Sequence, residues 1–252
     1  MNEKQINLAV AEHQTGATLF EPDASTGPAG GVILLHGGGA DRSMCHLWAE
    51  ALVAQGLCAL SVDIDGHGQS TRPMTGLRDA TQAVSAAADF LGGSAQVDAA
   101  RLAVWGVSLG GSLAILAGAR DKRLQVIVAA GAPYRLNDYD LTKMLVAPGF
   151  WQGVPALQEP RKDLLYALVE CLDDRDVLAA ISKIEVRTLL LVYGAHDLHV
   201  PLSDGQYLHG LAPQPVYLWV KWLEHLDLAT NERVITGIAE WIAARLAQLE
   251  NP

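Results

Sequence analysis

Short apolar runs and longer segments of helical apolar spacing alternate along most of the chain. Continuous apolar runs of strand length lie at 31–35, 57–62, 102–105, 124–130, 188–193 and 216–220. Runs of this kind are typical of strands that are buried on both faces of a parallel sheet. Segments of helical spacing lie between or after them, at 45–55, 77–91, 109–119, 201–211 and 231–249. The alternation predicts a mostly parallel sheet with helices on both faces.

The beginning of the chain has a different pattern. Residues 6–10 and 17–20 have the composition of two short strands, and Thr15-Gly16 between them predicts the turn of a hairpin.

The alternation also stops between residues 134 and 186. Several prolines in this stretch precede a segment of helical patterning at 161–184. A segment of this length is too long for a plain loop in a compact domain. We therefore expect a single domain, 1–252, with a helical cap inserted at 134–186.

The strand at 102–105 leads directly into Gly106-Val107-Ser108-Leu109-Gly110, which opens the helix at 109–119. A G-x-S-x-G pattern between a strand and a helix predicts a nucleophile elbow, in which a serine hydroxyl projects from a sharp turn. Side chains two residues before and two residues after the serine would collide in such a turn. Gly106 and Gly110 occupy these two positions and have no side chains, so they fit the turn. The helix N-terminus beside Ser108 favours negative charge.

Polar residues follow two further strands of the predicted sheet. Asp197 comes after the strand at 188–193, and His225 comes after the strand at 216–220. In open α/β sheets, functional groups gather at the carboxyl ends of the strands. Both residues are therefore candidates to meet Ser108. Two structural interpretations stay open: Asp197 as the cap of the next helix, and His225 as a core histidine.

Together with two glycine-rich loops, these motifs resemble the α/β-hydrolase family, from residue 30 to the end of the chain. The matching motifs are the elbow, His36-Gly37-Gly38-Gly39, Gly66-His67-Gly68-Gln69-Ser70, Gly194-x-x-Asp197 and the late His225. The order Ser, Asp, His along the chain is the order of this family. The resemblance implies an α/β-hydrolase fold, with a mostly parallel central sheet, helices on both faces and a short helical cap insertion.

The resemblance also implies a catalytic triad. Ser108 would be the nucleophile, His225 the base that takes its proton, and Asp197 the group that orients the imidazole.

The two glycine-rich loops have implied roles as well. The N–H groups of Leu109 and Gly38 would form the oxyanion hole, with Gly37 as the alternative to Gly38. His36 would brace this loop through hydrogen bonds. The loop that contains Asp63, Asp65 and His67 would be structural rather than part of the site.

A serine nucleophile implies chemistry through an acyl-enzyme, and we expect a hydrolase that cleaves carboxylic esters of small or medium acyl groups. Met144, Phe150 and Trp151 in the cap are candidates to line the acyl pocket, although ordinary cap packing explains them equally well. The open alternatives are a thioesterase, lipase, peptidase, acyltransferase, carbon–carbon hydrolase or haloperoxidase with the same triad. A non-catalytic ligand-binding protein on this fold is a further alternative.

Composition and charge indicate which classes of partner and which cellular location to expect. The net charge of −10 argues against nucleic acid or an anionic membrane as a partner. The sequence has no apolar run of membrane-spanning length and no signal-peptide pattern, so we expect a cytoplasmic protein. The three cysteines, Cys45, Cys58 and Cys171, form no paired motif and are expected to be reduced, buried thiols. We expect a small-molecule ester or thioester substrate, and a homodimer is compatible with the sequence.

Neither a metal nor an organic cofactor is expected. His196 and His199 flank Asp197, but no third ligand follows at a recognisable spacing. The glycine-rich loop at 36–39 does not match the dinucleotide-binding pattern, because Arg42 occupies the position of its last glycine.

Overall fold

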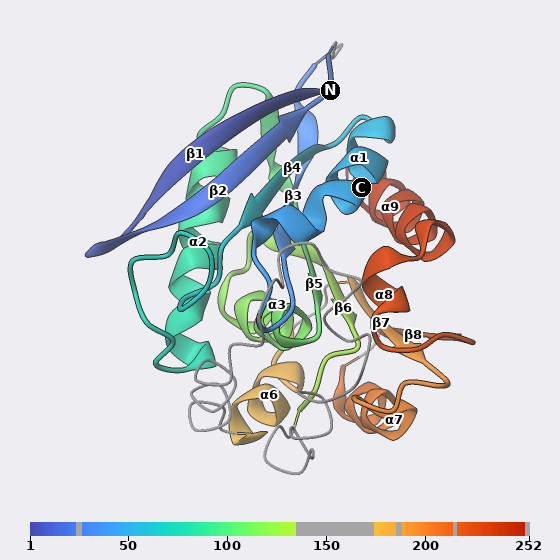
Figure 1. Cartoon of the computed structure of the whole chain (residues 1–252). Coiled ribbons are helices and arrows are strands. Elements are labelled where there is room, and N and C mark those ends of the chain that lie inside the picture. The colour runs from blue at the N-terminus through green and yellow to red at the C-terminus, as the bar shows by residue number, and fades with distance from the viewer. Residues whose placement is uncertain (24–26, 135–173, 185–187, 214–215, 250–252) are drawn as a thin grey trace.

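The computed structural model describes residues 1–23, 27–134, 174–184, 188–213 and 216–249. The centre of this part is an eight-stranded sheet with the strand order β1-β2-β4-β3-β5-β6-β7-β8 (Figure 1). The strands are β1 (Asn2–Val10), β2 (His13–Glu21), β3 (Ala29–Leu35), β4 (Cys58–Val62), β5 (Val97–Val107), β6 (Leu124–Ala130), β7 (Thr188–Gly194) and β8 (Val216–Lys221). β1 and β2 are antiparallel to their neighbours, and β4, β3, β5, β6, β7 and β8 are parallel. The mostly parallel sheet is confirmed.

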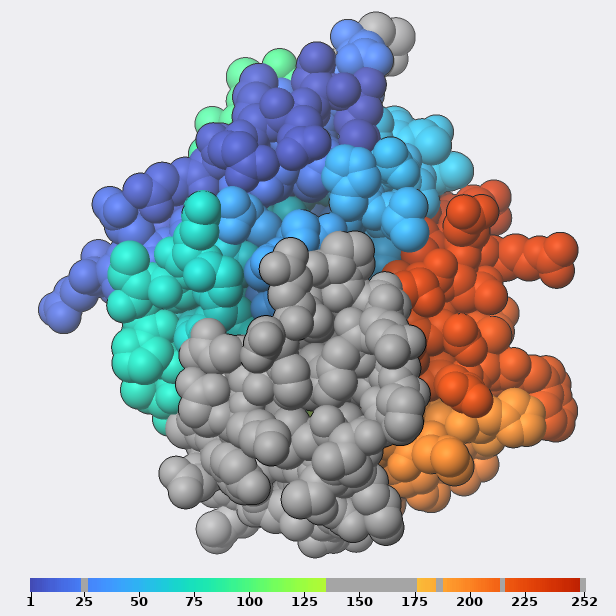
Figure 2. Space-filling view, viewed as in Figure 1, coloured from blue at the N-terminus to red at the C-terminus, as the bar shows by residue number. Residues whose placement is uncertain are grey.

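Helices cover both faces of this sheet. α2 (Leu77–Gly92) and α3 (Leu109–Arg120) pack on one face, together with α6 (Asp174–Ile181) and α7 (Leu202–Leu211). The short 3-10 helix η1 (Arg42–Cys45), α1 (His46–Ala54), α8 (Asp227–Thr230) and α9 (Glu232–Ala247) pack on the other face. Figure 2 shows the N-terminal strands and the C-terminal segments on opposite sides of the molecule, as the strand order requires.

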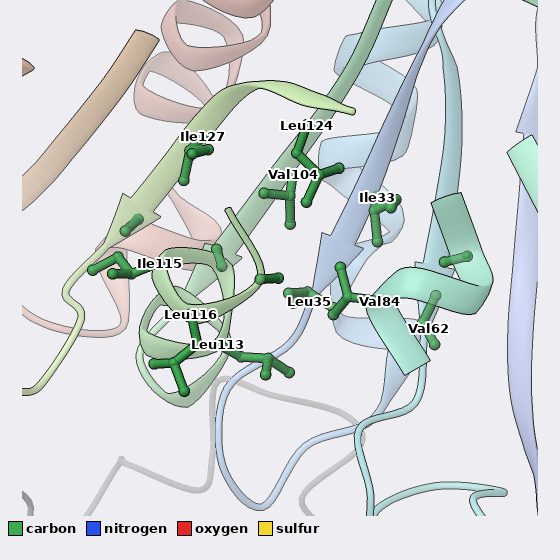
Figure 3. Packing of buried hydrophobic residues seen from close by; sticks show 14 of the residues in the cluster. Ile33, Leu35, Val62, Val84, Val104, Leu113, Ile115, Leu116, Leu124 and Ile127 are labelled. Atoms are coloured by element: carbon green, nitrogen blue, oxygen red, sulfur yellow. The ribbon is translucent and has the colours of Figure 1, made fainter. Parts of the chain in front are cut away.

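The apolar runs form strands because each run has two apolar faces to bury. In β3, Ile33 and Leu35 belong to the cluster under α2 and α3, whereas Val32 and Leu34 belong to the cluster under α1 and α9. This period of two is the spacing of side chains along a strand. Figure 3 shows Ile33 and Leu35 among the side chains of the first cluster, close to Val84 of α2.

The N-terminal hairpin turns earlier than predicted. β1 and β2 pair on either side of Ala11 and Glu12, which form the turn. The predicted turn at Thr15-Gly16 is wrong, because both residues lie within β2. A Cβ atom on Gly16 would come within 2.7 Å of both the Arg42 guanidinium and the Asp63 carboxylate. Gly16 therefore makes room for this ion pair and does not bend the chain.

Element boundaries differ from the predictions mainly at the ends. The elbow strand was expected at 102–105, but β5 begins at Val97 and ends at Val107. The helix expected at 45–55 begins with a turn of 3-10 helix, and the closing helix expected at 231–249 ends at Ala247. The side chain of Asn231 caps this last helix by accepting a hydrogen bond from the Val234 N–H.

The predicted cap, 134–186, lies outside the described residues except for residue 134 and residues 174–184. α6 agrees with the helical pattern expected at 161–184. The candidate pocket residues Met144, Phe150 and Trp151 lie outside the described residues, as does Cys171.

Cys45 and Cys58 are buried free thiols, as expected, and burial raises the pKa of each. No helix in the described ranges is long and apolar enough to cross a membrane.

Candidate active site

The turn at Ser108 has the strained geometry of an elbow. Ser108 lies between β5 and α3 with a φ of 54°, in the region that non-glycine residues rarely adopt. A Cβ atom on Gly106 would come within 2.0 Å of the Gly110 carbonyl oxygen. One on Gly110 would come within 2.3 Å of the Leu35 carbonyl oxygen. The two glycines are therefore required by backbone contacts, as the motif predicts.

The end of β6 and the residues that follow it hold this turn in place. The Ser108 N–H donates a hydrogen bond of 2.8 Å to the Ala130 carbonyl at the end of β6. The Ser112 hydroxyl, one turn along α3, donates to the Pro133 carbonyl at 2.6 Å. Ser108 precedes the first turn of α3, where N–H groups have no acceptor within the helix. The N–H of Leu109 is thus a candidate donor to an anion at the serine.

The loop after β3 lies directly beside Ser108. A Cβ atom on Gly37 would be only 3.6 Å from the Ser108 Cβ. The neighbouring His36 is fully buried, and its Nδ1–H donates to the Gly37 carbonyl at 2.8 Å. Its Nε2 accepts from the Ile64 N–H at 3.0 Å. The prediction that His36 braces this loop is confirmed.

These bonds require a neutral His36, because a protonated ring could not accept from Ile64. Burial lowers the pKa of His36 to about 4, and this effect outweighs its hydrogen bond to Gly37.

A second histidine contacts the same loop, and this contact was not predicted from the sequence. His67 Nε2 accepts a hydrogen bond of 3.0 Å from the Gly39 N–H, and His67 Nδ1–H donates to the Asp65 carbonyl at 2.9 Å. The Gly66-His67-Gly68 sequence is part of one of the motifs that resemble the α/β-hydrolase family, and it indicated a structural loop. Its partner is 28 residues away in the chain, so only the folded structure could identify it.

Asp63 has the structural role that was expected of it. Its buried carboxylate pairs with the Arg42 guanidinium and accepts from the backbone N–H groups of Arg42 and Gln69 at 2.8 Å each. Arg42 also donates to the side chains of Thr18 and Gln5. This network ties the loop after β4 to the start of η1 and to the N-terminal hairpin.

The loops after β7 and β8 bring Asp197 and His225 together. Asp197 Oδ2 lies 2.6 Å from His225 Nδ1, and both side chains are buried. The other carboxylate oxygen, Oδ1, accepts from the N–H groups of His199 and Val200 at 2.8 Å each. These contacts fix the carboxylate and orient the imidazole, so that Nε2 is the ring nitrogen not bound to Asp197.

The His225 ring lies against the end of β6. A Cβ atom on Gly131 would be 3.1 Å from His225 Cε1, and Gly131 follows Ala130, the acceptor of the Ser108 N–H. Ser108 and His225 are thus both placed at the end of the same strand. The ring of His199 lies 5.6 Å from the His225 ring, and burial and the nearby His225 lower the pKa of His199.

The histidines that suggested a metal site have other contacts. His196 lies against the Trp222 ring at 5.3 Å between ring centroids. Within the described ranges, no group of three or more His, Cys, Asp or Glu residues is arranged to hold a metal ion.

The fold and the order of these residues define an α/β-hydrolase. Residues 26–180 match the family model described as serine aminopeptidase, S33, and the chain belongs to this family. An uncharacterized protein of Mycobacterium tuberculosis is 36% identical over 223 residues, which cover 86% of this chain and 72% of the relative. The pimeloyl-[acyl-carrier protein] methyl ester esterase of Neisseria meningitidis is 31% identical over 216 residues, which cover 71% of this chain and 79% of the relative.

A solved structure supports the same fold. The complex of DcsB with its substrate analogue aligns with a TM-score of 0.80 at 15% identity, over 98% of this chain and all of that one (100%).

Proposed function

We propose that this α/β-hydrolase cleaves carboxylic esters of small or medium acyl groups through an acyl-enzyme on Ser108. The observation that carries the proposal is the strained Ser108 turn together with the 2.6 Å contact between Asp197 and His225. The identity to a methyl ester esterase supports an ester as the substrate.

In the proposed mechanism, Ser108 Oγ attacks the ester carbonyl while His225 Nε2 takes the hydroxyl proton. Asp197 keeps the imidazole in the tautomer with a proton on Nδ1 and stabilises the positive ring. His225 then gives the proton to the departing alcohol, which leaves an acyl group on Ser108. A water molecule, activated by the same imidazole, releases the acid and restores the serine.

The oxyanion of each tetrahedral intermediate would be bound by the N–H groups of Leu109 and Gly38. The peptide between Gly37 and Gly38 is planar and trans, so its C=O and N–H point in opposite directions. Because its C=O accepts from His36, the N–H of Gly38 points away from that histidine, which favours Gly38 over Gly37. Loss of one such donor typically costs about 3–4 kcal/mol of transition-state stabilisation.

We assign the choice of acyl group to the insertion between β6 and β7. Met144, Phe150 and Trp151 are its candidate pocket residues, since they could supply the apolar wall that an acyl chain needs.

The first experiment treats the purified protein with a fluorophosphonate and maps the modified residue by mass spectrometry. We expect stoichiometric labelling of Ser108 in the wild type and none in Ser108→Ala or His225→Ala. Ser203→Ala, which changes an exposed serine on α7, is the matched control and should label normally. A panel of p-nitrophenyl esters of graded acyl length then measures kcat/KM.

Other outcomes would contradict the proposal. Faster cleavage of aminoacyl p-nitroanilides than of any ester would indicate the peptidase activity named in the family description. A dominant transfer product at low concentrations of added alcohol would indicate an acyltransferase. Absence of labelling in a folded sample would favour a ligand-binding protein.

A further inference from the structure

We infer that His67 is a positioning residue of the oxyanion hole, which holds the peptide after Gly38 so that the Gly38 N–H faces the substrate carbonyl. The inference rests on the proposed function, because it assigns a task to the loop beside Ser108.

The glycine loop at 37–39 needs support from other segments of the chain. Gly37, Gly38 and Gly39 have no side chains that could anchor them, and Gly39 has a φ of 78°. A run of three glycines has more accessible backbone conformations than any other sequence of this length. The donor in an oxyanion hole must be preorganised, because reorienting it during the reaction costs much of its benefit.

Two histidines hold two consecutive peptide groups of this loop. The His36 Nδ1–H binds the carbonyl of Gly37, which fixes the peptide between Gly37 and Gly38. His67 Nε2 binds the N–H of Gly39, which fixes the peptide between Gly38 and Gly39. Because both flanking peptide planes are held, rotation about the two backbone dihedral angles of Gly38 is restricted.

His67 is itself held in place by its surroundings. It is 4% exposed, its backbone N–H donates to the Ile64 carbonyl at 2.9 Å, and its ring lies 5.1 Å from the His36 ring. It is flanked by Gly66 and Gly68, whose φ angles are 76° and 50°. A Cβ atom on Gly68 would come within 2.2 Å of the Asp63 carboxylate, so the turn closes tightly around this buried group.

The two hydrogen bonds of the His67 ring specify its tautomer. Nδ1 must carry the proton, because it donates to the Asp65 carbonyl, and Nε2 must be unprotonated, because it accepts from Gly39. A histidine that merely filled space would have no such requirement. The tautomer is therefore an observable that separates positioning from packing.

The kinetic test compares His67→Phe, which fills similar space without an acceptor, with His67→Gln, whose amide oxygen can still accept from Gly39. We expect His67→Phe to lower kcat by about 10- to 100-fold with little change in KM, because a misplaced donor weakens transition-state binding rather than substrate binding. His67→Gln should recover most of the loss. His46→Phe, at an exposed histidine on α1, is the control and should retain wild-type kcat.

Binding of a transition-state analogue provides a second readout. A trifluoromethyl ketone that adds to Ser108 forms an oxyanion, so its affinity should fall by the same factor as kcat/KM in His67→Phe. Thermal unfolding of each variant shows whether the fold is intact. If His67→Phe does not fold, His67→Gln and the tautomer measurement on the wild type still test the inference.

The third readout needs no activity. ¹⁵N NMR of the wild-type imidazole nitrogens should show the Nδ1–H tautomer of His67, with Nε2 as a hydrogen-bond acceptor. The inference is overturned by an Nε2–H tautomer, by wild-type kcat in His67→Phe, or by equal losses in both variants without loss of ketone affinity. Ester hydrolysis that survives Ser108→Ala would instead overturn the proposed function, and the tautomer would still report on the contact with Gly39.

Discussion

Single glycines at the elbow are held in close contact with backbone carbonyl groups. Gly110, the second residue of α3, lies directly against the end of β3, where a Cβ atom would come within 2.3 Å of the Leu35 carbonyl oxygen and 2.5 Å of the His36 carbonyl oxygen. Backbone atoms at such distances cannot move aside as a flexible side chain could. The same residue therefore controls both the fold and the distance between Ser108 and the oxyanion loop.

We therefore expect Gly110→Ala to lower the free energy of unfolding by about 3 kcal/mol or more, or to prevent folding. Gly237→Ala is the matched control. Gly237 lies in α9, where no other segment of the described chain comes within 4 Å of the position that a Cβ atom would take. Alanine there should stabilise the protein by about 0.5–1 kcal/mol. Urea unfolding measures both, and equal effects of the two substitutions would contradict the steric argument.

The neutral state of His36 makes stability depend on pH. Burial lowers its pKa from 6.5 to about 4 in the folded protein, so between these values the unfolded chain binds more protons. Stability therefore increases with pH across this window. The contribution of His36 is fully present above pH ~6.5 and is lost as the pH falls toward ~4, with a total of about 3 kcal/mol.

The measurement is the free energy of unfolding from pH 4 to 7 in the wild type and in His36→Gln. The variant should be less stable at pH 7 but should have a shallower slope over this range. Parallel curves for the two proteins would show that His36 does not titrate as expected.

At the scale of elements, α9 depends on a local cap at its N-terminus. The Asn231 side chain accepts from the Val234 N–H, and the helix then buries one face against α1 and the sheet. We expect Asn231→Ala to lower the free energy of unfolding by about 1 kcal/mol, whereas Asn231→Asp should retain most of it because aspartate also caps. Urea unfolding of the three proteins decides this, and a stable Asn231→Ala would mean that packing alone holds the helix.

The ends of four parallel strands meet at the candidate site. β3 leads to the glycine loop, β5 to Ser108, β7 to Asp197 and β8 to His225. β6 lies between β5 and β7, and its end contacts both Ser108 and the His225 ring. A parallel sheet brings these segments to one edge, because all its strands end on the same side.

At the scale of the whole molecule, the insertion between β6 and β7 is the part that should set substrate preference. We expect Trp151→Ala to change the ratio of kcat/KM between short and medium acyl esters by about 10-fold or more, as removal of a pocket wall does in other enzymes. Fluorophosphonate labelling of Ser108 should stay intact. Trp222→Ala, at a side chain that is 82% exposed, is the control. An unchanged acyl preference would exclude Trp151 from the pocket.

Two properties of the whole molecule remain predictions. A cytoplasmic location is an expectation from the sequence alone, and a homodimer is compatible with the sequence. Size-exclusion chromatography with light scattering would measure the oligomeric state.

Much of this protein could be derived from residues that are close together in the chain. The strand runs, the helical spacing and the G-x-S-x-G turn depend on local periodicity and on backbone sterics, which act over a few residues. The two glycines of the elbow follow from the same local argument. The chain order of Ser108, Asp197 and His225 is that of the α/β-hydrolase family, and this resemblance predicted the mostly parallel sheet with helices on both faces.

Only the tertiary structure decided which side chains become partners across long stretches of chain. Gly16 looked like a turn residue, but it makes room for Arg42 and Asp63, which come from other segments. The loop of His67 was expected to be structural, but the sequence did not indicate that the His67 ring accepts a hydrogen bond from the Gly39 N–H. The physical reason is that these contacts form only after β3 and β4 pair side by side, so no local pattern in the sequence contains them.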